Sequence, residues 1–352
     1  MIKDIIYIGA SKDLSHPSDR RGYPEFKKRN SYLKNENNFS FKEKLKILFL
    51  CPSNIELIKK FIENSKNKSN KKYRLILIYT DFYHADNNKI ISKIRNIYRN
   101  IMYRNNDDYI DLITNIIRRA DKLVLGSSFQ REAIISILGD EIRSKTFFIE
   151  DYIEKDFINK YKENNKNNLN IIWEGIGYGA LLPLIQLLIV SYKSLKNNIK
   201  IKIFFLTDPY ISLVGKIVFP TSFLFKFINL FNSKLIYKKW SKENLIKYSK
   251  LSQIAIITIN SMEKRSYYKP ANKPRLFSSL GLKYIFVPNI PDYKLFSKKY
   301  KNLTLFYSIN DLFFKIKELF IKKQKFDNNF DIFNAKEHNI MVDKKWKNIL
   351  YE

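Results

Sequence analysis

The order of apolar and polar positions predicts alternating strands and helices along the whole chain. Short runs rich in Ile, Leu, Val and Phe, typical of strands buried on both faces, recur between longer segments with helical spacing. The expected strands are 4–9, 45–51, 73–79, 122–125, 146–149, 170–173, 199–206, 234–237, 254–259, 284–287 and 303–306. The expected helices are 55–63, 88–120, 129–138, 181–195, 242–250, 273–280 and 309–321. This alternation predicts an α/β protein with parallel sheets covered by helices.

A change in composition divides the chain into two halves. Segment 155–168 is rich in Lys and Asn and nearly free of aliphatic residues, which indicates a linker or an exposed helix between two cores. We therefore expect one domain over 1–160 and a second over 161–330. The remaining tail, 331–352, is predicted to end in a helix with Val342, Trp346, Ile349 and Leu350 on one stripe, and such a stripe must dock on another surface.

Two apolar stretches, 180–190 and 211–231, approach the length of a membrane span. The first is too short and the second is interrupted by Lys216, Pro220 and Lys226, whereas a span needs about 18 uninterrupted apolar residues. The second stretch could lie on a bilayer with its lysines at the headgroups, or the stretches could form a partly buried helix pair. The apolar run 5–10 is too short for a signal peptide, so we expect a cytoplasmic protein.

The charge balance is strongly basic, with 64 Lys and Arg against 34 Asp and Glu and a formal net charge of +30. Phosphate-rich partners such as nucleic acid, anionic lipid or nucleotides would suit this charge. The Lys residues are spread along the chain, whereas a nucleic-acid reader clusters its charge and favours Arg. The single cysteine, Cys51, and three scattered histidines argue against a structural metal cluster or a disulfide, and we expect no tightly bound metal.

Two loops of the first half contain candidate chemistry, since ligands bind at the carboxyl ends of parallel strands. Ser11 follows the first strand and leads to Arg20 and Arg21, which could bind an acceptor or an anion, or form a solvated turn. Asp81 and His84 follow the third strand, where a His near a carboxylate could orient or deprotonate a hydroxyl. The alternative is a surface histidine beside a capping Asp.

The second half has a glycine-rich loop directly after its first strand. Gly175, Gly177 and Gly179 precede an apolar helix, where backbone N–H groups and the helix N-terminus can approach a phosphate. The spacing lacks the features of a dinucleotide fingerprint or a P-loop, so the motif is weak by itself. Glu174 offers an acceptor for sugar or ribose hydroxyls.

Further along, Lys269, Lys273 and Arg275 crowd the start of a predicted helix, together with Asn272. Positive charge there is unfavourable with the helix dipole unless an anion binds. A diphosphate would resolve this conflict, although ordinary Lys richness would also produce the cluster.

This stretch resembles the donor segment of glycosyltransferases with two Rossmann-like domains, the GT-B fold, and in particular the large retaining family of bacterial mannosyl- and glucosyltransferases. The pieces that carry the resemblance, in order along the chain, are 119–132, 148–153, 240–245, 251–257, Lys269, Asn272, Lys273 and 281–286. Their order is more informative than any one of them. The resemblance departs at Tyr268 and Leu276, which occupy positions where the family often has glutamates, and 175–182 lacks the usual cation.

The resemblance implies two Rossmann-like domains that face a cleft, with a C-terminal helix that crosses back to the N-terminal domain. It implies transfer of a hexose from a nucleotide-sugar, bound by the second domain, to a hydroxyl of a glycan, lipid or small acceptor, with retention and without a tightly bound metal. A peripheral contact with the inner face of an anionic membrane is also expected, and nucleic acid is not an expected partner. Two alternatives remain open: a basic nucleic-acid-binding or RNA-modifying α/β protein, and a relative that kept the fold and lost the donor site.

Overall fold

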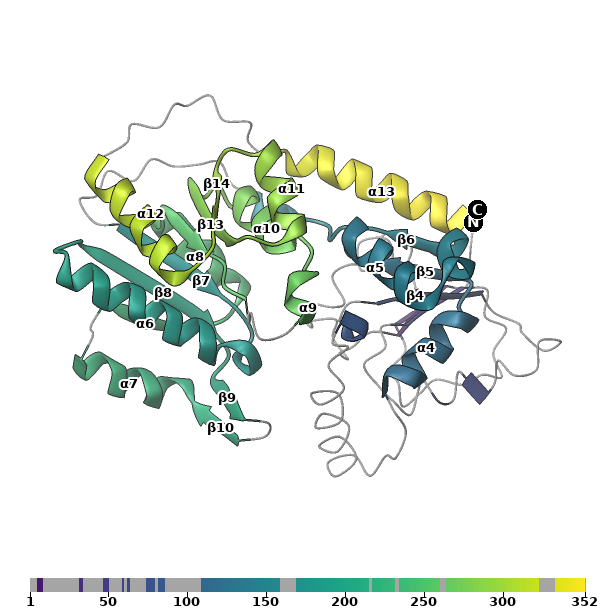
Figure 1. Ribbon diagram of the computed structural model, residues 1–352, viewed down its shortest axis with the longest axis horizontal. Helices are drawn as coiled ribbons and strands as arrows, with labels where there is room; N and C mark the ends of the chain where they lie inside the picture. Colours follow the sequence, from purple (N-terminus) through teal and green to yellow (C-terminus); the bar gives the residue numbers. More distant parts are fainter. Residues whose placement is uncertain are drawn as a thin grey trace. The chain divides into compact units, whose positions relative to one another are not determined.

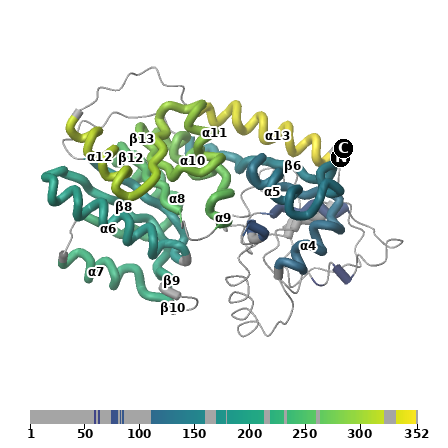
Figure 2. Tube along the Cα trace, in the orientation of Figure 1, coloured from purple at the N-terminus to yellow at the C-terminus, as the bar shows by residue number. Residues whose placement is uncertain are grey.

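The computed structural model divides the chain into two α/β units, each with its own parallel sheet (Figures 1 and 2). It describes residues 5–8, 32–33, 47–50, 59, 62–63, 74–79, 82–85, 109–158, 169–214, 217–231, 234–259, 264–322 and 333–351. The first unit combines Met1–Tyr152, Glu263–Pro270 and Lys336–Glu352. The second unit combines Ile153–Met262 and Ala271–Ala335.

The sheet of the first unit has the strand order β2-β1-β3-β4-β5-β6, with all neighbours parallel. Its strands are β1 (Ile5–Ile8), β2 (Tyr32–Leu33), β3 (Ile47–Leu50), β4 (Arg74–Ile78), β5 (Lys122–Leu125) and β6 (Thr146–Phe148). Its helices before residue 150 include the short η4 (Tyr83–Ala85), α4 (Tyr109–Arg119), α5 (Ser128–Leu138) and the short η5 (Asp140–Lys145). The sequence predicted every strand of this sheet except the two-residue β2.

The two faces of this sheet are covered by different helices. Leu75 and Leu77 of β4 pack with Ile113 of α4 and Ile134 of α5. Ile76 and Ile78, which alternate with them, pack with the C-terminal helix α13 (Ala335–Tyr351). The expected stripe of that helix is buried there: Val342, Trp346, Ile349 and Leu350 are each at most 3% exposed. The structure thus confirms that the terminal helix packs on the N-terminal sheet.

The sheet of the second unit has the order β11-β8-β7-β12-β13-β14, again with all neighbours parallel. Its strands are β7 (Leu169–Glu174), β8 (Ile201–Thr207), β11 (Leu235–Lys239), β12 (Ile254–Ile256), β13 (Tyr284–Pro288) and β14 (Leu303–Phe306). In chain order this is the 3-2-1-4-5-6 arrangement of a Rossmann fold, and the direction of winding reverses between β7 and β12.

The second sheet is also a central layer between helices (Figure 1). One face packs on α6 (Leu181–Lys196), α7 (Thr221–Phe231) and α12 (Ile309–Lys322). The other face packs on α8 (Lys242–Leu251), α10 (Asn272–Ser279) and α11 (Pro291–Lys299). Alternate side chains of strand β7 point to opposite faces of the sheet, so Ile171 and Trp173 lie in one hydrophobic cluster and Ile172 lies in the other.

The stretch 211–231, for which helix was one expectation, begins instead as a β-hairpin. Strands β9 (Tyr210–Val214) and β10 (Ile217–Pro220) pair antiparallel, and α7 begins only at Thr221. The expectation of helix was wrong up to Pro220, because the proline ring disfavours helical geometry at Phe219 and because Ile217 and Val218 favour extended backbone. None of the helices in the described part of the chain is long and apolar enough to cross a bilayer.

Candidate functional site

The candidate donor segments of the second unit meet at the point where its strand order reverses. Glu174 ends β7, and Lys273 lies in the first turn of α10, which follows β12. The Lys273 Nζ atom donates to the Glu174 carbonyl oxygen at 2.6 Å and lies 3.2 Å from the Glu174 Oε1 atom. The pair joins positions 99 residues apart. Ligands of open parallel sheets bind at this crevice, so the fold brings the predicted residues to the appropriate edge.

The glycine loop leaves β7 under close packing constraints. The Trp173 indole stacks on Phe205, with ring centroids 4.2 Å apart, and its Nε1 atom donates to the Thr258 hydroxyl at 2.9 Å. A Cβ atom at Gly175 would lie 2.5 Å from the Trp173 Cη2 atom. Gly175 is therefore needed for the fit of the loop over the indole.

Gly177 is held by the segment that follows β8. Its backbone N–H donates to the Asp208 Oδ2 atom at 2.7 Å, and a Cβ atom there would lie 2.0 Å from the Tyr210 carbonyl oxygen. This N–H is thus already bound to an anionic oxygen of the protein. At Gly179, by contrast, an added Cβ atom would have no neighbour within 4 Å. Of the three glycines, Gly179 is the one that leaves open space next to its backbone.

The helix that follows this loop, α6, has no acidic side chain of its own at its N-terminus. Ala180 caps it without a side-chain hydrogen bond, and no acidic residue lies in its first turn. The helix has 16 residues, so the partial positive charge at its start is fully developed. The N-terminus of α6 therefore favours an anion at the carboxyl edge of the sheet.

The start of α10 is organised by buried groups of α11. The Ala271 N–H donates to the Asp292 carboxylate, which is 7% exposed. Burial raises the pKa of the neighbouring Tyr293 phenol, and the charges of Asp292 and Glu174 raise it further. Tyr293 is consequently a neutral phenol at physiological pH, next to the Lys273–Glu174 pair. The guanidinium of Arg275 lies 5.3 Å from the centre of the Phe296 ring.

The departures from the family pattern have structural explanations. Leu276 is 9% exposed and belongs to the hydrophobic cluster beneath α10. Tyr268 packs on Phe82 of the first unit, with ring centroids 5.1 Å apart. Lys269 is exposed and belongs to the segment Glu263–Pro270 of the first unit, so only Asn272, Lys273 and Arg275 of the predicted donor segment lie in the second.

His84 lies in the core of the first unit rather than at its surface. It is 2% exposed, its Nδ1 atom lies 2.8 Å from the Tyr79 hydroxyl, and its Nε2 atom lies 2.9 Å from the Thr114 hydroxyl. Burial lowers its pKa to about 4, so the ring is neutral at physiological pH. These contacts give His84 a structural role, and both of its nitrogens are engaged.

The other predicted residues of the N-terminal half lie outside the described residues. They are Ser11, Arg20, Arg21 and Asp81. Their predicted roles in acceptor binding and proton transfer stay predictions. Within the described part of the chain, no group of three or more His, Cys, Asp or Glu side chains could hold a metal ion.

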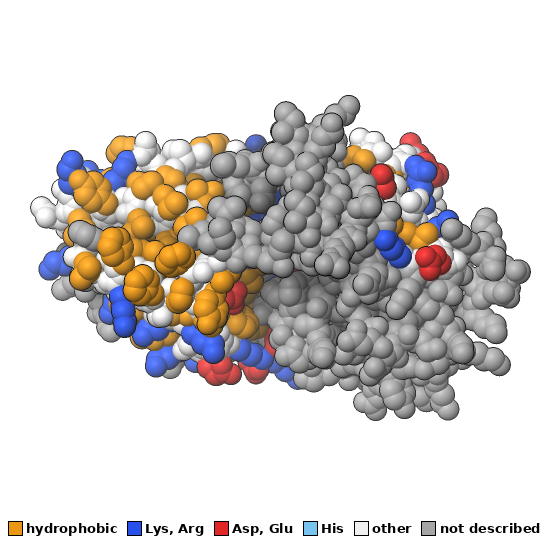
Figure 3. Space-filling view, turned by 90° about the horizontal axis from the view of Figure 1, so that it is seen from below, with side chains coloured by type: hydrophobic (Ala, Val, Ile, Leu, Met, Phe, Trp, Pro, Cys, Tyr) orange, Lys and Arg blue, Asp and Glu red, His pale blue; other side chains and the backbone are white. Residues whose placement is uncertain are grey.

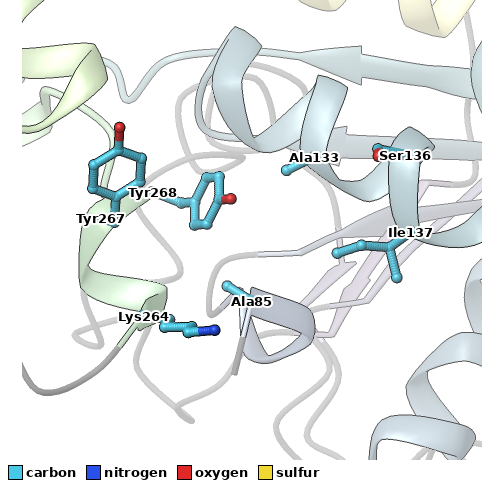
Figure 4. Close-up of a pocket in the computed structure, with 7 residues that line it drawn as sticks. All are labelled: Ala85, Ala133, Ser136, Ile137, Lys264, Tyr267 and Tyr268. Atoms are coloured by element: carbon cyan, nitrogen blue, oxygen red, sulfur yellow. The ribbon is translucent and has the colours of Figure 1, made fainter. Parts of the chain in front are cut away.

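The first unit contains a pocket of about 380 Å³ beside η4 and α5 (Figure 4). Ala85 follows the carboxyl end of β4, Ala133, Ser136 and Ile137 come from α5, and Lys264, Tyr267 and Tyr268 come from α9 (Lys264–Tyr267) and the residue after it. Figure 4 shows the Tyr268 ring between α9 and α5, and the Lys264 amine directed toward Ala85. A cation, two phenols and a serine hydroxyl are groups that bind a hydroxyl-rich ligand.

Asp208 is the residue of this region that the sequence interpretation missed. It directly follows β8 and is the single acidic residue between Glu174 and Glu243. An isolated carboxylate at the end of a buried strand, in a basic and apolar stretch, is a signal that could have identified it.

Comparisons with solved structures identify the architecture. The chain is similar to a lipopolysaccharide outer core galactosyltransferase, WaaB, at 10% identity over 99% of both chains, with a TM-score of 0.57. It is similar to a sucrose-phosphate synthase from Thermosynechococcus elongatus at 9% identity over 99% of both chains, with a TM-score of 0.56. It is also similar to the pneumococcal O-GlcNAc transferase GtfA, solved with UDP and GlcNAc, at 13% identity over 87% of this chain and 57% of that one, with a TM-score of 0.54.

These similarities, together with the strand order of the second unit, define the class: the chain has the two-domain Rossmann-like fold of GT-B glycosyltransferases. No protein-family model matches the chain, and no curated protein matches it in sequence.

Proposed function

We propose that the protein is a glycosyltransferase that moves a hexose from a nucleotide-sugar to a hydroxyl of a glycan, a lipid-linked or a small acceptor. The observation that carries this proposal is the contact of Lys273 with Glu174 at the switch point of the second sheet. It assembles a cation, a carboxylate, the open backbone at Gly179 and the N-terminus of α6 at one edge. Among proteins of this fold, GtfA was solved with UDP, a nucleoside diphosphate.

Glycosyl transfer from a nucleotide-sugar requires groups that stabilise the leaving nucleoside diphosphate. The bond between the sugar C1 and the phosphate oxygen breaks, a bond from C1 to the acceptor oxygen forms, and the acceptor releases a proton. Negative charge then develops on the diphosphate, and Lys273, Arg275 and the N-terminus of α6 favour that charge electrostatically. A tightly bound metal is not part of this proposal, because cations and backbone dipoles supply the positive charge.

Glu174 has two roles in the proposed site. Its carboxylate neutralises Lys273 and holds the cation in place. When a diphosphate binds, its oxygens compete for the Lys273 ammonium, and the Glu174 carboxylate becomes an acceptor for hydroxyls of the sugar or ribose. We assign donor binding to Glu174, Gly179, Asn272, Lys273 and Arg275, and loop packing to Gly175 and Gly177.

For the acceptor we propose the pocket of the first unit. Its tyrosines present ring faces and hydroxyls to a sugar, and Lys264 suits an acceptor with an anionic group. Retention of configuration and proton transfer by Asp81 remain part of the proposal on the strength of the family resemblance. We further propose a peripheral location at the inner face of a membrane, where lipid-linked acceptors reside.

One observation favours a second candidate, a non-catalytic relative with this fold. Leu276 is buried where the resembled family often has the ribose-binding glutamate, and Asp208 occupies the N–H of Gly177. A panel of UDP-, GDP- and ADP-sugars distinguishes the two. We expect at least one to raise the melting temperature and to release its nucleoside diphosphate in the presence of an acceptor mixture. No stabilisation by any donor would contradict the glycosyltransferase proposal and favour the relative that has lost the donor site.

The same samples address the nucleic-acid alternative. RNA binding at sub-micromolar affinity in physiological salt, with no response to any nucleotide-sugar, would replace the glycosyltransferase proposal.

A further inference from the structure

Helix α7 presents apolar side chains on two opposite faces. Phe225 and Ile228 are buried against the sheet. Phe223, Phe227 and Leu230, spaced as one outer stripe, are 61%, 59% and 76% exposed. A surface helix of a water-soluble protein normally carries polar side chains on its outer face. The outer stripe of α7 is therefore more apolar than the solvated face of an ordinary surface helix.

The hairpin before α7 extends this surface. Tyr210 of β9 and Val218 and Phe219 of β10 are also exposed, and β10 runs directly into α7. Figure 3 shows apolar side chains gathered on the face of the second unit that α7 and the hairpin form. We call these six residues of α7 and the hairpin the α7 face. On α6, which packs on the same face of the sheet as α7, Ile185, Ile189 and Tyr192 are exposed as well.

The chain segment that forms the α7 face and α6 is rich in lysine. Between Glu174 and Glu243 the chain has ten Lys residues and one acidic residue, Asp208. The Asp208 carboxylate is partly exposed and accepts a hydrogen bond from the N–H of Gly177. The exposed lysines of this region include Lys226 on α7 itself, Lys196 on α6 and Lys239 at the end of β11. An apolar stripe on a helix that also carries the exposed Lys226, within a lysine-rich segment, is complementary to an anionic bilayer. The acyl chains accept the apolar side chains, and the anionic headgroups attract the lysines.

We propose that the α7 face docks on an anionic membrane surface, with Phe223, Phe227 and Leu230 at the boundary of headgroups and acyl chains. This inference gives a surface to the peripheral location proposed above, and it does not depend on donor chemistry. Tyr210 of the hairpin contacts Gly177, so docking would hold the glycine loop close to the bilayer. An acceptor anchored in that bilayer would then be within reach of the donor edge.

A second copy of the chain is a less favourable occupant of the same surface. Two α7 faces in contact would bring two lysine-rich segments together, and between Glu174 and Glu243 the partly exposed Asp208 is the single carboxylate that offsets their charge. Like charges across an interface oppose association. Anionic lipid removes this repulsion.

Co-sedimentation of the full chain with vesicles tests the proposal. We expect binding to vesicles that contain phosphatidylglycerol, and binding at least about tenfold weaker to phosphatidylcholine alone or in about 0.5 M salt. Phe223→Ser with Phe227→Ser should weaken binding by at least about tenfold, because two aromatic rings no longer enter the bilayer. Leu295→Ser is the matched control, since Leu295 is 54% exposed on α11, on the opposite face of the same sheet.

A charge variant covers the case in which the double variant does not fold. Lys226→Glu changes an exposed side chain and should weaken binding to phosphatidylglycerol by about fivefold or more. The proposal is overturned if the chain does not bind phosphatidylglycerol vesicles, or if Lys226→Glu and the folded double variant bind like the parent. A dimer that Phe227→Ser dissociates, without vesicle binding, would assign the surface to a second copy. Nucleotide-sugar binding is measured without vesicles, so its failure is a separate result.

Discussion

His84 is a titratable ring in the interior of the first unit, and its charge state depends on folding. His84 is buried between Tyr79 and Thr114, and burial lowers its pKa from 6.5 to about 4. Because the folded protein binds this proton more weakly than the unfolded chain, acid favours unfolding. The stabilisation is complete above pH 6.5 and is lost as the pH falls toward 4.

We expect His84→Gln to flatten the pH dependence of stability in that window. The parent should lose up to about 3 kcal/mol of unfolding free energy from this group between pH 6.5 and 4. Urea unfolding at a series of pH values measures the slope for both proteins. Equal slopes would show that His84 is not a buried neutral ring.

The ion pair of Lys273 with Glu174 also belongs to the scale of individual residues. Its side chain is 40% exposed and that of Glu174 is 12% exposed, so solvent screens the attraction. With the hydrogen bond to the Glu174 carbonyl, we expect the contact to contribute about 1 kcal/mol to stability. The sequence suggested a cation repelled by its helix, and the structure instead gives it a carboxylate.

At the scale of elements, the glycine loop contains one glycine that is needed for packing, Gly177, and one that leaves space for a ligand, Gly179. Gly177→Ala would force a Cβ atom against the Tyr210 carbonyl oxygen, and we expect it to lower stability by about 2 kcal/mol. Gly179→Ala has open space, so its stability should change by less than about 0.5 kcal/mol. Thermal unfolding of the two variants measures the contrast.

The affinity of Gly179→Ala for a nucleoside diphosphate is a second measurement on this variant. If the diphosphate approaches the backbone at Gly179, its affinity should fall by about tenfold in this variant. An unchanged affinity would move the phosphates away from the loop and toward α10.

The terminal helix is the element that completes the first core. Trp346 is 1% exposed and packs with Ile78 and Val124, so Trp346→Ala should lower the free energy of unfolding by about 3–5 kcal/mol. Lys347→Ala, an exposed change on the next residue, should stay within about 0.5 kcal/mol. Denaturant titration compares them, and equal stabilities would contradict the packing of α13.

The sequence predicted the strands that are continuous apolar runs and the helices whose apolar residues follow helical spacing. The buried strands, α6, α8, α10 and α12 follow from such runs, and the Trp346 stripe predicted the docking of α13. The hairpin before α7 could not be separated from a helix by apolarity alone, although Pro220 contained the signal. For the site, the order of motifs identified Lys273, but its partner Glu174 lies 99 residues away and only the fold brings the two together.

The burial of His84 could not be predicted from the sequence. Its place after a strand made a catalytic role a reasonable hypothesis, but spacing does not reveal whether a side chain turns outward or into the core. The contacts of Tyr79 and Thr114 depend on the packing of α4 on the sheet, which only the structure contains.

At the scale of the whole molecule, the chain passes from one unit to the other more than once. Segments Glu263–Pro270 and Lys336–Glu352 return to the first unit after the second has begun. The donor segment is thereby split, because Lys269 belongs to the first unit and Lys273 to the second. The central claim concerns the second unit alone: the edge formed by Glu174, the glycine loop and α10 binds a nucleoside diphosphate.

Isothermal calorimetry of UDP, GDP and ADP with the parent, Lys273→Ala and Lys294→Ala tests that claim most directly. Lys294 is an exposed lysine of α11 and serves as the control for lost charge. We predict that at least one diphosphate binds the parent, that Lys273→Ala weakens it by about tenfold to a hundredfold, and that Lys294→Ala stays within about twofold. If no diphosphate binds, or if Lys273→Ala and Arg275→Ala both retain the parent affinity, the donor site is not at this edge.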